Sequence, residues 1–367
     1  MAHSIIVGML LTCVGGARWI ALPAWSTQEP SSTAASPADG ASLQETVVVP
    51  SFSSPLPEGK NVVWTATFQV SWDRLGALFK EPLSIGGAEE ISRLLNRSTF
   101  QEDQVPVGSG YAIAGSVEEG ILGTIKKDMD RLFPDAHPTL EQASSGWVAY
   151  SYLRAAVKFE FRFQDDYLEF KDSKGKSTNV TAFGLFERDN WKHPRVRDRV
   201  DILFNESEKG VSRAFAVDPC SVSKSVQLIL AKIPKKGSFE ETWREVEKKI
   251  SNAVKGPEST LSGIDTFVCP NITVATTHHF KELEGKKLIS SSSKDNTKRI
   301  VSAWQSIHFA LDREGAQVES ESMIRILPLP KALLLDGPFL VILRKRDGGI
   351  PFFAMWVDNP ELMLPLK

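Results

Sequence analysis

The chain has 367 residues, of which 42% are hydrophobic and 24% are charged, so it can form a globular protein with a large buried core. Its formal net charge is −2, and no basic stretch with interleaved aromatic residues occurs, so we expect no nucleic-acid partner. Internal repeats and coiled-coil heptads are also absent from the sequence.

The first 24 residues have the pattern of a signal peptide. An apolar run, Ile5–Ala17, ends in small residues and is too short to span a bilayer as a stable anchor. We therefore expect an exported protein, secreted or extracytoplasmic, with no membrane span. Residues 25–57 are rich in Ser, Thr, Ala and Pro, which predicts a flexible linker. This division places the folded domain at residues 58–367.

Helical periodicity occurs twice in the first part of this domain. It covers Gly86–Arg97 and Ser116–Phe133, and acidic residues such as Glu89 and Glu118 stand near the predicted N-terminal ends. Negative charge is favourable there because the N-terminal end of a helix carries a partial positive charge. We expect one helix in each stretch.

Two cysteines, Cys220 and Cys269, remain once the signal peptide is removed. Export permits a disulfide between them. Two isolated cysteines are more often buried free thiols, which is the interpretation that we favour. The sequence alone leaves the pairing open.

The sequence contains none of the common catalytic motifs: no nucleophile elbow, zinc-protease helix, paired-cysteine motif or phosphate-binding loop. His278 and His279 are adjacent, and adjacent strand residues point to opposite faces, so a shared metal is not expected. We expect neither an enzyme nor a bound metal or cofactor.

Other polar residues that could suggest chemistry have simpler interpretations. Asp165, Asp166 and Asp172 can be drawn as carboxylate pairs, but a solvated turn between strands explains them better. His308 lies in the middle of a predicted strand, where we expect a hydrogen-bonded structural histidine.

Three strands are predicted near the C-terminus. Val301–Asp312 alternates apolar and polar residues, and two apolar stretches follow at residues 338–346 and 350–358. Asp347-Gly348-Gly349 separates the last two and has the composition of a hairpin turn.

The polar stretch after the first of these strands is patterned as a strand too. In extended form it would place small residues on one face, namely Ala316, Val318, Ser320 and Ser322. The other face would carry Gln317, Glu319, Glu321 and Met323. A loop with this pattern can store a conformational change in which it enters a sheet.

This tail resembles the serpins, a family of protease inhibitors whose exposed loop inserts into a sheet. The resemblance lies in Gln305–Gly315, which is similar to the family's fifth A-sheet strand and its Glu-x-Gly hinge. It continues in Gly337–Leu343, similar to a Pro-Phe strand, and in Phe353–Pro360, similar to the closing strand.

Further segments match the family in the same order along the chain. Strands are implied at Tyr150–Phe163, Val226–Pro234 and Phe267–Pro270, helices at Phe239–Ile250 and His279–Leu283, and the start of the buried central helix at Gly59–Trp64. The resemblance implies an α+β fold with large mixed β-sheets and an exposed reactive-centre-like loop. Only 93 residues separate Asn61 from Ala155, fewer than in the family, which implies a trimmed N-terminal helical lobe.

If the resemblance holds, it implies a secreted, monomeric inhibitor that is cleaved by a target protease of serine or cysteine type. The hinge would be Glu314, Gly315 and Ala316, and after cleavage the freed arm would enter the central sheet. Val318, Ser320 and Ser322 would then be buried with Ala316.

Three bonds are candidates for the cleavage. Counting as in the family gives Leu329-Pro330, although a bond before proline is a poor protease substrate. Arg325-Ile326 suits a trypsin-like protease but leaves an arm of ten residues, about 33 Å long at 3.3 Å per residue. Cleavage at Lys331-Ala332 leaves an arm about 53 Å long at the same rise per residue. On length, Lys331 or Leu329 fits better than Arg325.

Several positions depart from the family. Gln305 replaces the histidine of the sheet-opening region, Ala155 replaces its asparagine partner, and Phe163 replaces a tryptophan. Thr65-Ala66 replaces a Ser-Pro pair, and Met355 replaces a glycine. The lack of the usual polar pair implies a sheet that stays closed, so the alternative is a non-inhibitory binding or scaffold protein of the same fold.

Overall fold

The computed structural model describes residues 43–134, 136, 140, 144–155, 157, 159–186, 194–208, 211–256, 259–289, 298–313 and 330–366. Two thirds of its strands belong to one large sheet. In spatial order these are β1 (Thr46–Val48), β2 (Asn61–Thr65), β17 (Phe353–Val357), β16 (Phe339–Lys345), β10 (Val226–Lys232), β9 (Val211–Asp218), β15 (Ala332–Leu334), β11 (Thr266–Pro270), β7 (Ser177–Leu185) and β6 (Gln164–Lys171). A further strand, β8 (Asp201–Glu208), pairs with β9.

The other strands form three separate pairs. These are β12 (Ile272–His279) with β14 (Trp304–Leu311), β4 (Gly110–Ser116) with β5 (Trp147–Leu153), and β3 (Ser84–Ile85) with β13 (Leu288–Ile289). In the large sheet β1–β2, β11–β15 and β15–β9 are parallel and the remaining pairs antiparallel. The α+β class with large mixed sheets is therefore confirmed.

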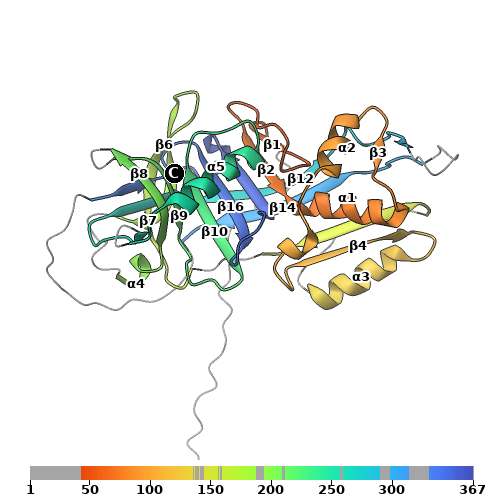
Figure 1. Cartoon of the computed structure of the whole chain (residues 1–367), viewed down its shortest axis with the longest axis horizontal. Coiled ribbons are helices and arrows are strands. Elements are labelled where there is room, and N and C mark those ends of the chain that lie inside the picture. Colours follow the sequence, from red (N-terminus) through yellow and green to blue (C-terminus); the bar gives the residue numbers. More distant parts are fainter. Residues whose placement is uncertain are drawn as a thin grey trace, which may run out of the picture. The chain divides into compact units, whose positions relative to one another are not determined.

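The helices of the described residues are few. They are α1 (Ala66–Phe79), α2 (Glu89–Asn96), α3 (Ile121–Leu132), the single turn α4 (Pro194–Arg197) and α5 (Phe239–Asn252), with 3₁₀ turns η1 (Glu102–Gln104) and η4 (Pro360–Leu362). In Figure 1 α5 crosses the large sheet, and α1 lies along the β4–β5 pair. Ser238 caps α5 because its hydroxyl accepts a hydrogen bond from Glu241 N at 3.2 Å.

The predicted linker is wrong at its C-terminal end. β1 pairs with β2, and Val49, Phe52 and Leu56 are buried in the core. The Phe52 ring stacks on that of Phe239 with centroids 6.1 Å apart. Residues 43–57 thus belong to the folded domain, since their apolar side chains are covered by α5 and the large sheet.

Gly59–Trp64 is not the start of a helix. Asn61–Thr65 is strand β2, with all five residues buried between β1 and β17, and the helix begins one residue later at Ala66. A run containing two valines and a tryptophan favours a doubly buried strand. The resemblance locates this region correctly but misplaces the boundary by a few residues.

Three other predicted elements differ in extent. The strand predicted at Tyr150–Phe163 ends at Leu153 because its partner β4 begins opposite, at Gly110. His279–Leu283 forms the end of β12 and a turn rather than a helix. The helix predicted from Ser116 starts at Ile121, since Glu118 is held by the Ser116 hydroxyl and by Gly146 N. The strands at 301–312, 338–346 and 350–358 and the helices at 86–97 and 239–250 are confirmed within a few residues.

Candidate functional site

The candidate site is the region where the β4–β5 and β12–β14 pairs meet α1. Among the described residues β5 pairs only with β4, and β14 pairs only with β12. Each inner strand therefore has one edge whose main-chain groups have no strand partner in this part of the chain. Such an edge is a template for another strand.

Polar side chains tie both inner strands to the first turn of α1. Gln305 on β14 donates through Nε2 to Thr65 Oγ1 at 2.7 Å and to Thr67 Oγ1 at 2.5 Å. Ser151 on β5 donates through Oγ to Thr67 O at 2.5 Å. We call Thr65, Thr67, Ser151 and Gln305 the α1 latch. Because β14 and β5 both bond to Thr67, the two strands reach the same point at the start of α1.

The α1 latch differs from the arrangement expected from the sequence. Gln305 stands where the resemblance places a histidine, but its partners lie on α1, and Ala155 is only packed against the core. Ser151 and Thr67 were not identified from the sequence. The sequence did offer a signal for Thr67, because Thr65 and Thr67 flank Ala66, the first residue of the helix. No local sequence pattern distinguishes Ser151.

Gln305 is 4% exposed, and its Oε1 has no hydrogen-bond partner among the described residues. A buried carbonyl oxygen without a donor costs about 1–3 kcal/mol. In the α1 latch, therefore, the Nε2 of Gln305 is hydrogen-bonded and its Oε1 is not.

The N-terminal side of the loop is anchored next to β14. Arg313 O accepts a hydrogen bond from Phe163 N at 3.2 Å, and the Arg313 guanidinium forms an ion pair with Asp165. Phe163 thus contacts the chain just beyond β14, and its ring packs against Phe183 and Phe267 of the large sheet, with centroids 5.5 and 5.8 Å away. The predicted hinge and insertion residues that follow, Glu314, Gly315, Ala316, Val318, Ser320 and Ser322, lie outside the described residues, as do Arg325 and Leu329.

The C-terminal side of the loop is anchored at Lys331. Lys331 N donates to Asp265 Oδ1 at 2.7 Å, and its ammonium group lies 3.3 Å from Asp265 Oδ2. Lys331 O accepts a hydrogen bond from Thr266 N at 2.8 Å, and Ala332 pairs with both β11 and β9. The side chains of Lys331 and Asp265 are only 12% and 2% exposed.

This anchoring argues against Lys331-Ala332 as the cleaved bond. A protease needs an exposed, extractable segment, whereas this bond is hydrogen-bonded on both sides and its side chain is committed to a buried carboxylate. The anchoring of Lys331 therefore weighs against the preference for it on grounds of length, and the position of the cleaved bond stays a prediction.

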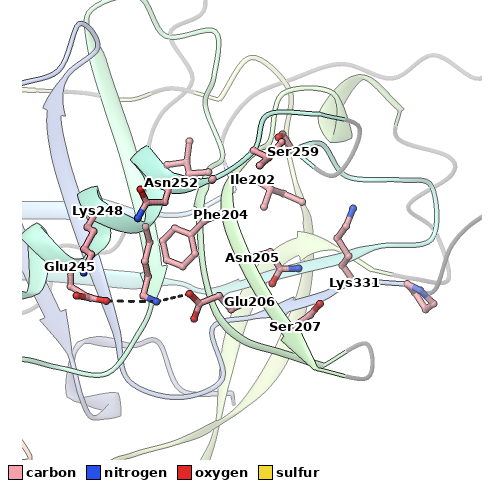
Figure 2. Close-up of a pocket in the computed structure, with 15 residues that line it drawn as sticks. Ile202, Phe204, Asn205, Glu206, Ser207, Glu245, Lys248, Asn252, Ser259 and Lys331 are labelled. Carbon is pink, nitrogen blue, oxygen red and sulfur yellow. Dashed lines mark hydrogen bonds and ion pairs between the residues drawn. The ribbon is translucent and has the colours of Figure 1, made fainter.

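A groove of about 900 Å³ lies beside this anchor, and we call it the loop-root groove. It runs between β8 and the C-terminal half of α5, and Pro330 and Lys331 close one end. Figure 2 shows Phe204 turned toward α5 and Asn205 turned to the side of Lys331. Lys249 crosses the groove to Glu206, with their charged atoms 2.5 Å apart.

The histidines do not form a site. His279 Nδ1 lies 2.8 Å from Glu284 Oε1, while His278 packs edge-on against Phe280 with centroids 4.8 Å apart. Burial lowers the pKa of His278. The side chain of His308 on β14 is exposed and has no hydrogen bond with the described residues, so its predicted structural role is wrong.

The aspartates and cysteines have structural surroundings. Asp165 and Asp166 belong to β6 rather than to a turn, and Asp172 accepts a hydrogen bond from Lys176 N at 2.8 Å in the turn to β7. Cys220 and Cys269 are buried and are not joined by a disulfide, as favoured from the sequence, and burial raises the pKa of both thiols.

Among the residues that the structure describes, no group of three or more His, Cys, Asp or Glu side chains is placed to hold a metal ion. In the same part of the chain, none of the helices has the length and apolar character needed to cross a membrane.

Comparison with known proteins gives likeness of fold alone. No family model and no curated protein sequence matches the chain. Among solved structures, the chain is similar to native protease nexin-1 with heparin, with 11% identity and a TM-score of 0.48 over 82% of this chain and 92% of that one. It is also similar to thyroxine-binding globulin in complex with thyroxine, with 13% identity and a TM-score of 0.47 over 82% and 93%. A structure of human thyroxine-binding globulin complexed with thyroxine has 12% identity and a TM-score of 0.47 over 82% of this chain and 92% of that one.

At these identities and TM-scores the likeness says nothing about what this chain binds or inhibits.

Proposed function

We propose that this protein is a secreted protease inhibitor that acts by cleavage of its loop and entry of the freed arm between β5 and β14. The observation that carries the proposal is that β5 and β14, each with one edge unpaired among the described residues, both bond to Thr67 at the start of α1. An arm entering between them would gain main-chain hydrogen bonds on both sides. Its small residues would be buried over α1, and the strain of the opened sheet would be released.

The length of the strands favours cleavage after Arg325. β14 has eight residues, which span roughly 26 Å at 3.3 Å per residue. An arm from Ala316 to Arg325 spans about 33 Å on the same rise, so it suffices for a strand of this length. Leu329 remains possible on length but precedes a proline. Arg325 is therefore our choice for the residue that enters the pocket of a trypsin-like protease.

The alternative is a binding or scaffold protein of the same fold whose sheet stays closed. The α1 latch favours it, because Gln305 is bonded to Thr65 and Thr67 at the start of the helix and would resist movement of β14 away from α1. The two functions differ in what happens when the loop is cut.

The test is exposure of the mature protein to a trypsin-like serine protease. An inhibitor gives a covalent complex that survives SDS, and the cleaved form melts at a much higher temperature than the intact one. A binding protein is cut without forming a complex, and its melting temperature stays unchanged, which would falsify the inhibitory mechanism.

Two matched pairs of variants locate the residues. Val318→Glu should convert the inhibitor into a plain substrate because its charge would be buried on insertion, whereas Gln317→Glu, on the opposite face, should keep complex formation. Arg325→Ala should abolish cleavage by a trypsin-like protease, whereas Lys331→Ala should leave the cleavage position unchanged. If Val318→Glu and Gln317→Glu form the complex equally well, the proposed inserting arm is contradicted. If Arg325→Ala and Lys331→Ala are cleaved alike, the proposed cleavage position is contradicted.

A further inference from the structure

The loop-root groove contains a free sheet edge. β8 pairs with β9 along one side, and on the other side the described residues supply one isolated bridge, between Asp201 and Thr260. Six consecutive residues of β8, from Ile202 to Ser207, line the groove. Consecutive strand residues point to opposite faces, so such a run lines one hollow only if the hollow follows the edge of the backbone. Main-chain groups of β8 therefore border the groove.

The walls of the groove suit an extended chain. Ile202 and Phe204 are buried under α5 and give the groove an apolar floor, and Val254 stands 90% exposed at its rim. The pairing of β8 with β9 shifts register between Ile202 and Phe204 and between Glu206 and Ser207. A regular run remains from Phe204 to Glu206, so few main-chain bonds are available and side chains must add to the affinity.

Among the described residues, the ammonium group of Lys248 in the groove has no ion-pair partner. Lys249 is paired with Glu206 at 2.5 Å and Glu245 at 3.7 Å, and Lys331 is paired with Asp265 at 3.3 Å. Lys248 is exposed beside them on α5 and forms no ion pair or hydrogen bond with the described residues. Figure 2 shows it at the α5 side of the groove.

We propose that the loop-root groove binds an extended acidic segment of a protein partner as an added strand on β8. The main chain of this segment pairs with the free edge, and alternate apolar side chains lie on the floor at Ile202 and Phe204. A carboxylate of the segment reaches Lys248. This binding site is separate from the opening between β5 and β14 and does not depend on cleavage of the loop.

The probe is a short acetylated peptide of alternating Val and Asp, with binding to the intact mature protein measured by fluorescence anisotropy. The same peptide with N-methyl groups on every second amide should bind at least about tenfold more weakly, because main-chain donors are lost. Equal binding of the methylated peptide would exclude strand addition.

Charge reversal tests the acidic preference. Lys248→Glu should weaken the Val-Asp peptide by about five- to tenfold and strengthen a Val-Lys peptide. Lys127→Glu on the remote helix α3 makes the same change in net charge and should alter neither affinity. Equal effects of the two variants, or none from Lys248→Glu, would overturn the assignment of the acidic partner.

Hydrogen exchange identifies the edge. Bound peptide should slow amide exchange within residues 202–207 and leave β14 and β5 unchanged. Protection at β14 or β5 instead, or no binding by any peptide at millimolar concentration, would overturn the site.

Discussion

The centre of the large sheet and the β12–β14 pair use their strand edges in opposite ways. β16 is paired with β10 on one side and β17 on the other, and Phe339–Leu343 are all buried. β14 has one paired edge, and its exposed residues Ser306, His308 and Ala310 alternate with more buried ones. The first region is closed by continuous apolar burial. The second buries only one face of β14, through Ile307 and Leu311, and polar contacts add to its stability. This smaller apolar burial suits a region that is proposed to rearrange.

The same substitution in the two regions should have different costs. Phe339→Ala removes a fully buried ring between paired strands and should destabilise the protein by about 3–5 kcal/mol. Phe309→Ala removes a half-buried ring of β14, stacked on Phe353 at 4.7 Å, and should cost about 1–2 kcal/mol. Urea unfolding of both variants gives the two values, and equal losses would contradict the contrast between the regions.

The hydrogen bonds of the α1 latch should provide most of the stabilisation that β14 receives from polar side chains. Gln305→Ala removes the amide donor to the hydroxyls of Thr65 and Thr67, which still bond to each other at 2.7 Å, and opens a small cavity. We expect a loss of about 2 kcal/mol. His308→Ala, on the exposed face of the same strand, should change the free energy of unfolding by less than about 0.5 kcal/mol. If the two variants unfold alike, the latch does not hold β14.

Elements with a simple period were predictable, whereas the contacts that define the candidate site were not. The alternation at 301–312 and the amphipathic pattern at 239–250 describe β14 and α5 because each depends on neighbouring residues alone. The α1 latch joins Gln305 to a threonine 240 positions away, and the loop anchor joins Lys331 to Asp265, 66 positions away. No local pattern encodes such pairs, so they emerge only from the assembled fold.

The turn between β12 and β14 should make the second region sensitive to acid. Glu284 accepts hydrogen bonds from Lys281 Nζ at 2.8 Å, from His279 Nδ1 at 2.8 Å and from Ala303 N at 3.2 Å. These bonds, that from Lys281 first, lower the pKa of Glu284 to about 2. Because the folded pKa is depressed, the stabilisation is present above the unfolded pKa, near 4.5, and is lost as the pH falls toward 2.

Glu284→Gln should therefore be less stable than the parent at pH 7. We expect a modest loss of about 1–2 kcal/mol, because water around Lys281 screens part of the charge interaction. The difference should shrink between pH 5 and pH 2, which thermal melts across this range would measure. A difference that stays constant with pH would mean that packing, rather than the charge, accounts for the loss. Glu282→Gln, in the same turn, is the matched control.

The smallest effect is expected on the exposed face of the β12–β14 pair. Thr277 Oγ1 and Ser306 Oγ lie 2.6 Å apart across the strands, and both residues are exposed. Water can replace this hydrogen bond, and valine keeps the β-branched shape that suits a strand, so Thr277→Val should change stability by less than about 0.5 kcal/mol. A larger loss, measured by urea unfolding, would mean that the exposed face also holds the pair together. The resistance to opening would then not be concentrated in the α1 latch beneath the strands.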